Sequence, residues 1–477
     1  MRTEIITAAL VVILAGCTVG PDYVRPNLAA AGHYHAVADK AASPASPAPA
    51  LDTWWRGFDD PELVVIVERV LAQNLDLEAS AARMEQARAA AQFAGASRLP
   101  EGSLDGDIAR QRQSIVSPLG KIASAFPGYE RKQTLSELGV GASWELDIAG
   151  SLHRRSEAAD AEYQAAEAAH AGVRISLVAE AADAYFQVRG AQARIAIAQD
   201  QIRNESGLVD LVNVRREGGV ATLRESSQAQ ALLLQAQASL PPLQRALAAQ
   251  LNRLDVLMGA APGTYASEIE SAPAAFTLPA IDTAGGPAQL LRRRPDVIAA
   301  ERKVAASNAV VGAAIAEYYP SFSLSSVLGL SSLQSGKLFT GDAFQPAAML
   351  GLHWRLFDFG RVDAQVKQAR GANREALLDY RASMLRATED VENAIVALNE
   401  LARQQALLEA EVKAHGQARD AAQEAYRGGA VSLLEVLDED RQLLAARDLL
   451  AQVRADDARS AVAAFRAMGG GWSGALQ

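Results

Sequence analysis

The stretches REGGVATLRE (Arg216–Glu225) and YRGGAVSLLE (Tyr426–Glu435) occur once in each half of this 477-residue chain, and they decide its fold. Each contains a glycine pair, Gly218-Gly219 in the first half and Gly428-Gly429 in the second, at an offset of 210 positions. A glycine pair after a long helical pattern is a natural helix end and turn. Each half is therefore predicted to contain a helical hairpin.

The repeat extends over most of the chain. Trp144 and Trp354 are also 210 positions apart, whereas upstream the offset becomes 220, as between Leu104 and Leu324. The ten-residue difference falls between Leu104 and Trp144, where an insertion costs least if it lies at a loop tip. Because two copies are too few for an open solenoid, we interpret the chain as a duplicated unit with a pseudo-twofold relation.

Composition excludes several classes of function. The formal net charge of −10 argues against nucleic-acid binding, which needs a basic face. The six histidines form no ligand cluster beyond His33-x-His35, which is expected to be solvated, and Gly218-Gly219 is better explained as a turn than as a phosphate loop. Cys17 is the only cysteine, so neither a disulfide within the chain nor a thiolate metal site is expected. The chain is predicted not to be an enzyme and to hold no metal or cofactor.

The N-terminus has the pattern of a secretory signal. A short apolar run precedes Leu14-Ala15-Gly16-Cys17 and is too short to span a bilayer. These four residues resemble a bacterial lipobox, so residues 1–16 are predicted to be a signal peptide and Cys17 the lipidated N-terminus. Thr18, rather than Asp, follows the cysteine, and the resemblance then points to the outer membrane. An ordinary signal with an incidental cysteine is the alternative.

Sequence patterns divide the mature chain into five further parts. Pro- and Ala-rich sequence indicates an extended segment, and Asp60-Pro61-Glu62 has the pattern of a helix start. The predicted parts are an extended lipidated segment (17–60), a first repeat (61–259, hairpin 100–149), a linker (260–286), a second repeat (287–469, hairpin 320–358) and a tail (470–477).

Within each predicted hairpin, the hydrophobic period changes from 3.6 to 2, which indicates strands with one apolar and one polar face. Such strands are long enough to cross hydrocarbon when tilted, but they would also suit a soluble sandwich. If they enter the membrane, several chains must share one sheet, because four strands cannot close and open edges in lipid leave backbone groups unsatisfied. The strands are expected at 103–111, 137–148, 321–331 and 348–356.

A long helical pattern follows each pair of strands. Neither Ser151–Gly218 nor Arg361–Gly428 contains an internal proline, and about 65 residues at ~1.5 Å each give on the order of 100 Å of helix. Apolar residues at strict 4-3 spacing predict a coiled-coil seam in both copies. Returning helices are expected at Thr222–Met258 and Ser432–Met468. The seam residues of the first copy are Leu177, Ala181, Ala184, Val188, Ala191, Ile195, Ala198 and Ile202.

Several motifs together resemble the TolC family, and in particular its outer-membrane efflux lipoproteins of the NodT/OprM type. The resemblance implies a mainly α fold in which a duplicated coiled coil forms an α-barrel and four strands per chain enter a shared twelve-stranded β-barrel of a homotrimer. It also implies a periplasmic adaptor and an inner-membrane transporter of the resistance-nodulation-division class as partners. The motifs are CTVGPDY (17–23), WWRGFDDPEL (54–63), RRRPDV (292–297), WRLFDFGR (354–361) and YRGG (426–429).

The same resemblance implies a gate next to the turn of the second helical hairpin, after Gly428-Gly429. The matching positions in the family bear carboxylates that constrict the closed periplasmic tip, so Glu435 and Asp438 of three copies are expected to form an acidic ring. They lie three residues apart and thus on one helix face. Such a ring would select cations and bind divalent ions. The alternative is a solvated acidic face that includes Glu439 and Asp440.

The resemblance also implies a latch that holds this hairpin closed. A tyrosine and basic residues near the turn would bond to the neighbouring coiled coil, with Glu225 as the acceptor. Val431 and Gln228 depart from the family's pattern, and Arg441 has an equal alternative partner in Asp438 on its own helix. The latch candidates are Tyr426, Arg427, Arg441, Glu225 and Gln228.

The leading hypothesis is therefore a passive trimeric exit duct for small toxic compounds, located in the outer membrane and extending into the periplasm. It is expected to contact outer-membrane lipid and to be opened at its periplasmic tip by partner proteins. Two alternatives stay open: a duct of the same architecture for type I protein export, and a coiled-coil lipoprotein or adaptor with a soluble β-domain.

Overall fold

The computed structural model describes residues 18–27, 34–35, 49–269, 276–281, 286 and 292–474. Cys17 and the expected signal peptide 1–16 lie outside these residues, as do parts of the linker 260–286 and the tail 470–477. The chain forms two compact units. Unit 1 comprises Met1–Pro26, Glu85–Ala165 and Ala300–Tyr380, and unit 2 comprises Asn27–Met84, Ala166–Ala299 and Arg381–Gln477.

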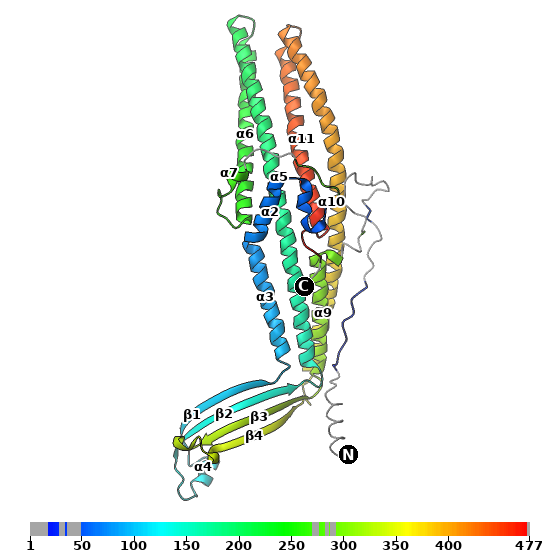
Figure 1. Cartoon of the computed structure of the whole chain (residues 1–477). Coiled ribbons are helices and arrows are strands. Elements are labelled where there is room, and N and C mark those ends of the chain that lie inside the picture. Colours follow the sequence, from blue (N-terminus) through cyan, green and yellow to red (C-terminus); the bar gives the residue numbers. More distant parts are fainter. Residues whose placement is uncertain are drawn as a thin grey trace. The chain divides into compact units, whose positions relative to one another are not determined.

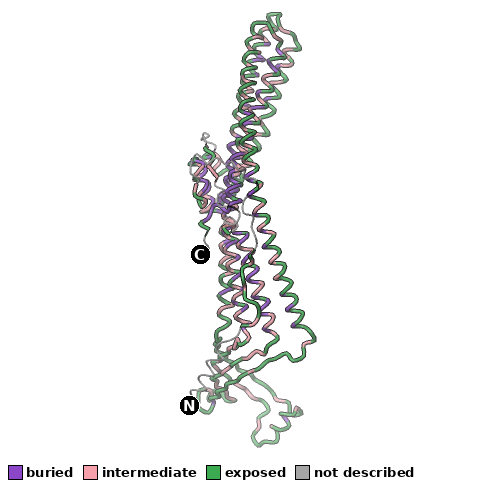
Figure 2. Tube along the Cα trace, turned by 90° about the vertical axis from the view of Figure 1, so that its right-hand side faces the viewer, coloured by how far each residue is buried: buried purple, intermediate pink, exposed green. Residues whose placement is uncertain are grey.

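Unit 1 contains one antiparallel sheet of four strands in the order β1-β2-β3-β4 (Figure 1). The short helix α4 (Pro118–Ala123) lies in the connection between β1 and β2. Most strand residues are exposed in the single chain (Figure 2). The strands are β1 (Glu101–Arg112), β2 (Lys132–Leu146), β3 (Ser321–Ser332) and β4 (Phe344–His353).

The last strand ends earlier than the alternating pattern predicted. β4 stops at His353, because His353 pairs with Ser321, the first residue of β3, and later residues have no partner in the ladder. Trp354 instead donates its indole N–H to the carbonyl of Tyr318 (3.1 Å). Asp358 then accepts hydrogen bonds from the backbone N–H groups of Gly360 and Val362, so the next helix begins here. The expectation of a strand over 348–356 was therefore wrong at its C-terminal end.

The helices follow the predicted duplication. Each half contains a helix of 67 residues, α5 (Ser151–Glu217) and α10 (Arg361–Arg427), and a returning helix of 35 residues, α6 (Leu223–Leu257) and α11 (Leu433–Ala467). Helices α2 (Pro61–Gln73) and α3 (Leu75–Ala96) precede the first strand pair, and α9 (Pro295–Ala316) precedes the second. Residues 287–291 lie outside the described part, so the predicted start of the second repeat at 287 is not tested.

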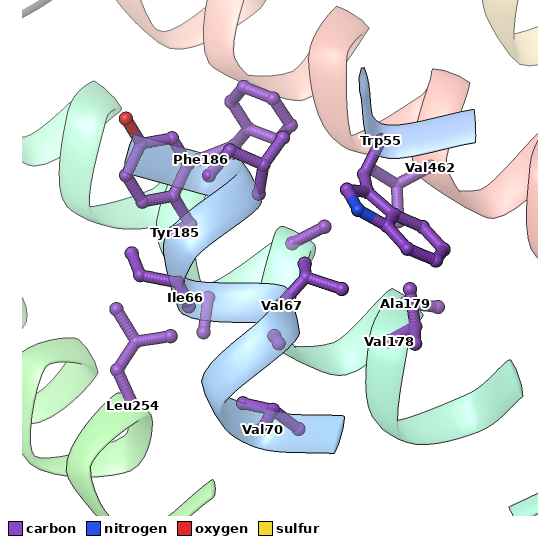
Figure 3. Close-up of a cluster of buried hydrophobic side chains, with 14 of the residues drawn as sticks. Trp55, Ile66, Val67, Val70, Val178, Ala179, Tyr185, Phe186, Leu254 and Val462 are labelled. Carbon is purple, nitrogen blue, oxygen red and sulfur yellow. The ribbon is translucent and has the colours of Figure 1, made fainter. Parts of the chain in front are cut away.

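The core of unit 2 surrounds α2. Asp60 caps α2 by accepting from the N–H groups of Glu62 and Leu63, as predicted, and the helix then buries Ile66, Val67 and Val70 (Figure 3). Aromatic and aliphatic side chains of α5, α6 and α11 surround it: Val178, Tyr185, Phe186, Leu254 and Val462 (Figure 3).

Part of the segment 17–60 is helical instead of extended. Leu51–Phe58 forms the 3₁₀ helix η1, whose Trp54, Trp55 and Phe58 are buried in the core of unit 2. The Pro-rich sequence before η1 favours an extended chain, but burial of these three aromatic side chains stabilises the helix at 51–58. A second short helix, α7 (Ala266–Ile269), lies in the linker with Ile269 buried.

The predicted coiled-coil seam of α5 is confirmed, since its residues are buried or half-buried along the helix. Among the described residues, no helix is both long and apolar enough to cross a membrane.

Candidate functional site

The two helical turns of unit 2 have the same backbone geometry. Gly219 and Gly429 have φ values of 74° and 76°, which favour glycine. The next N–H bonds back to a carbonyl five residues earlier, from Val220 to Arg215 (2.8 Å) and from Ala430 to Ala425 (2.9 Å). Each glycine pair therefore lies between a long helix and its returning helix, where the backbone turns.

Each returning helix begins with a carboxylate that caps it. The Glu225 carboxylate accepts from the Thr222 N–H at 2.6 Å, and this hydrogen bond holds the pKa of Glu225 below its usual value. Glu435 accepts from the Ser432 N–H more loosely, at 3.4 Å. Both contacts are halves of a capping box. The expected acceptor of the latch, Glu225, therefore already has a partner on its own helix.

The gate carboxylates are exposed in the single chain. Glu435 and Asp438 both face solvent, and Asp438 pairs with Arg441 at 2.7 Å, where both side chains are more than half exposed. The structure thus contains the pair between Arg441 and Asp438 within one helix, which was the alternative to a latch role for Arg441. The acidic ring itself needs further copies of the chain, so it stays a prediction.

Tyr426 is buried between the two hairpins. Its side chain packs with Val212, Val436 and Leu437, and the guanidinium of Arg215 lies 4.6 Å from the ring centroid. The Tyr426 hydroxyl is buried without a hydrogen-bond partner among the described residues. Arg427 is exposed, and Gln228 is half-buried. Tyr426 therefore contacts the neighbouring coiled coil by packing and a cation–π contact, and its latch role through hydrogen bonding stays a prediction.

A buried acidic pair that the sequence did not reveal lies further along these helices. Glu205 of α5 is 3% exposed, and one of its carboxylate oxygens has no partner among the described residues. Gln201 donates to the other oxygen, and the charge of Asp440 on α11 acts on Glu205. Arg419 on α10 lies 3.9 Å from Asp440. A cavity of about 20 Å³, room for roughly one water, adjoins Gln201, Arg419 and Asp440.

Burial, followed by the charge of Asp440, raises the pKa of Glu205 from 4.5 to about 7. A carboxyl whose pKa is higher in the folded state favours folding below its unfolded pKa, and this contribution is lost as pH rises through 7. Glu205→Gln is therefore expected to raise the melting temperature at pH 8 by a few degrees, for a gain of about 1–3 kcal/mol, and to leave it unchanged at pH 4.5. Thermal unfolding at the two pH values measures this difference.

Asp440→Asn is the matched variant for this prediction. It removes the charge that contributes second to the raised pKa of Glu205, so the loss of stability should be smaller and should be complete at a lower pH. An equal gain from Glu205→Gln at both pH values would contradict the assignment.

The sheet of unit 1 has two chemically distinct faces. One face carries apolar rows across the strands, such as Leu104–Val140–Leu328 and Trp144–Leu324–Leu350. On the opposite face Ser, Gly and acidic residues predominate, and no lysine or arginine occupies it in these strands. Its carboxylates are Glu101, Asp105, Asp107, Glu137 and Glu145.

The N-terminal segment is fixed to the helices of unit 1. Arg154 of α5, with a side chain 3% exposed, donates to the carbonyl of Val19 (3.2 Å) and pairs with Asp22 (2.7 Å). The Val19 N–H donates to the Ala149 carbonyl (3.2 Å), and Asn308 donates to the Pro21 carbonyl (2.9 Å). We call these contacts the N-terminal clamp. They hold the residues after Cys17 beside the start of α5.

Loss of the clamp is expected to free the N-terminal segment. Arg154→Gln removes the pair with Asp22 and the bond to Val19, at a cost of about 1–3 kcal/mol. Limited chymotrypsin digestion should then cut after Tyr23 at least several-fold faster. Arg155→Gln is the control, because Arg155 is 60% exposed and pairs only with Glu317, the residue after α9, among the contacts described for it. Equal digestion of the two variants would contradict a role for the clamp.

Comparison with known proteins identifies the class. The family model of outer membrane efflux proteins matches residues 66–260 and 286–470, one match for each repeat, and the chain belongs to this family. The offsets of the two matches, 220 at their starts and 210 at their ends, are those of the internal duplication. The protein is therefore an outer-membrane efflux channel with a TolC-like fold, as its motifs predicted.

Individual relatives agree with this class. The chain is 33% identical to the pyoverdine export outer membrane protein OpmQ of Pseudomonas putida over 88% of each chain. It is 30% identical to the outer membrane protein OprJ of Pseudomonas aeruginosa, covering 98% of this chain and 96% of OprJ. The solved structure of the outer-membrane channel OprN superimposes with a TM-score of 0.85 at 34% identity, over 96% of this chain and 100% of OprN.

Proposed function

We propose that three copies of this chain form one passive duct through which small toxic compounds leave the cell. The observation that carries the proposal is the sheet: β1 and β4 each pair on one side only within the described chain, while its two faces are apolar and acidic. Unpaired strand edges in lipid cost several kcal/mol per unsatisfied group. Pairing β1 of one copy with β4 of the next removes both edges, and three copies supply twelve strands.

The duct is proposed to work within a larger pump. An inner-membrane transporter of the resistance-nodulation-division class would supply the energy, and a periplasmic adaptor would open the tip at Glu435 and Asp438. Lipid on Cys17 would anchor each copy, and the N-terminal clamp would hold that anchor beside the start of α5.

We propose that the inner-membrane partner, rather than this chain, determines which compounds are exported. The names of three relatives refer to pyoverdine export, toluene efflux and antibiotic efflux. We propose small toxic organic compounds as the class that this duct carries. Its acidic inner face would attract cations electrostatically.

Two measurements on detergent-purified protein test the proposal. The mass of the particle should be three times that of the chain, and planar bilayers should show single-channel conductance. A monomeric particle without conductance, soluble after removal of the lipid, would support the adaptor alternative and refute the duct.

A further inference from the structure

The apolar face of the sheet becomes basic at its hairpin end. Arg110 and Arg112 of β1 share the face of Leu104 and Ile108, and Arg112 pairs directly with Lys132 of β2. All three basic side chains are exposed. No carboxylate lies on this face of β1 or β2, because the acidic residues of these strands occupy the opposite one.

The adjoining connection between β1 and β2 adds exposed apolar side chains to these charges. It contains α4 and exposes Val116, Leu119, Ile122 and Phe126 by 77%, 69%, 63% and 65%. Lys121 and Arg131 add charge, and Glu130 is the one carboxylate of residues 113–131. Basic residues beside exposed apolar ones are typical of elements that lie at a membrane surface.

The spacing places this basic end at a membrane boundary. The apolar band of this face runs along β2 from Leu146 to Ser136, whose partner on β1 is Ile108. This distance is ten residues, or ~33 Å along the strand at ~3.3 Å per residue. At a tilt of ~45° the band is ~23 Å tall, close to the ~25 Å band of outer-membrane strands. The pair Arg112–Lys132 lies four residues beyond Ser136, ~9 Å further along the membrane normal and thus at the level of the headgroups.

The leaflet follows from the N-terminal clamp and rests on the proposed function. Thr18, one residue from the proposed lipid on Cys17, packs against Gly150 at the opposite, helical end of β2. Exposed aromatic residues also mark this helical end, with Phe357 and Phe359 exposed by 87% and 98%. If the acyl chains enter the periplasmic leaflet there, the basic end of β1 and β2 lies in the outer leaflet.

We propose that Arg110, Arg112 and Lys132 form a binding site for the phosphate groups of an anionic glycolipid in the outer leaflet. Arginine suits this ligand because its guanidinium binds phosphate through two parallel hydrogen bonds. The exposed side chains of α4 contact the acyl chains or the sugar rings of the same lipid. The site belongs to the first repeat alone, since residues 333–343 of the β3–β4 connection contain one lysine and one aspartate. The ten extra residues of the first repeat fall in the same region.

Native mass spectrometry of the detergent-purified protein tests the site. The probes are diphosphorylated lipid A, dephosphorylated lipid A and phosphatidylcholine. The wild-type protein should retain the diphosphorylated lipid roughly tenfold better than the other two, a preference worth about 1.4 kcal/mol. Arg110→Gln/Arg112→Gln/Lys132→Gln should lose this preference. The charge-preserving variant Arg110→Lys/Arg112→Lys/Lys132→Arg should keep most of it.

Three outcomes would overturn the inference. The triple Gln variant keeps the preference, or the wild-type protein retains phosphorylated and dephosphorylated lipid equally, or the triple variant dissociates into single chains without any change in lipid retention. The last outcome would identify a second copy of the chain as the occupant. Conductance in phosphatidylcholine bilayers separates the two proposals: a conducting oligomer without lipid preference refutes only the lipid site, whereas a non-conducting monomer refutes the duct and the site together.

Discussion

Replacing Glu435 with Gln and Asp438 with Asn is expected to weaken block by divalent cations at least tenfold and to raise single-channel conductance. In a trimer these positions place six carboxylates around the tip. Two charges ~6 Å apart repel by about 0.7 kcal/mol in water, and a narrow lumen screens them less. A bound divalent ion offsets this repulsion. Neutral side chains therefore remove the negative charge that binds the ion, and the channel is then no longer blocked by it. Currents recorded in planar bilayers with and without divalent cations measure the effect.

The amide substitutions separate charge from fold. Gln at position 435 still serves as the third residue of the capping box that Glu435 forms with Ser432. Asn at position 438 releases only the exposed pair with Arg441, which is worth at most ~1 kcal/mol. A rise in conductance in this variant can therefore be attributed to the lost charge and not to a destabilised helix.

The duplication supplies the matched control. Glu225 is the counterpart of Glu435 and caps α6 through the same capping-box motif, while Gln228 already stands where the second repeat has Asp438. Glu225→Gln should therefore leave divalent block unchanged. If it weakens block as much as the double variant does, or if the double variant conducts like the wild-type protein, the ring is wrongly assigned.

Trp54→Ala is expected to produce the largest loss of stability, about 3–5 kcal/mol. Trp54 is fully buried, stacked on Phe465 of α11 with ring centroids 5.1 Å apart, and edge-on to Phe58 at 6.1 Å. Its indole N–H has no hydrogen-bond partner among the described residues, so its contribution comes from packing. A fall of several degrees in the temperature of thermal unfolding measures the loss.

Val65→Ala is the control for this prediction. Val65 lies on α2, beside the same core, but is 44% exposed, so its truncation should cost less than about 1 kcal/mol. Equal effects of the two substitutions would mean that η1 does not stabilise the core of unit 2.

The helices were predictable because their signals are local and occur twice. The Gly-Gly pairs, the absence of proline between Ser151 and Gly218, and the cap at Asp60 each act through neighbouring residues, and the structure places the helix ends at these points. The end of β4 was predicted less well. Alternation continues through Leu356, but the partner strand β3 begins at Ser321, opposite His353, and the cap at Asp358 starts the next helix. Neither of these limits can be read from the strand's own pattern.

For the candidate site, the sequence determined where the charged residues lie along the helices. The tertiary structure determined how far they are buried and which residues they contact. Spacing alone placed Glu435 and Asp438 on one helix face beside a turn, since helical geometry relates residues three apart. Only packing decided that Glu205 is buried near Asp440, a residue 235 positions away, and that Arg154 holds Val19 and Asp22. A pKa and a buried ion pair depend on the dielectric surroundings and on partners distant in the chain, and these exist only once the helices have packed.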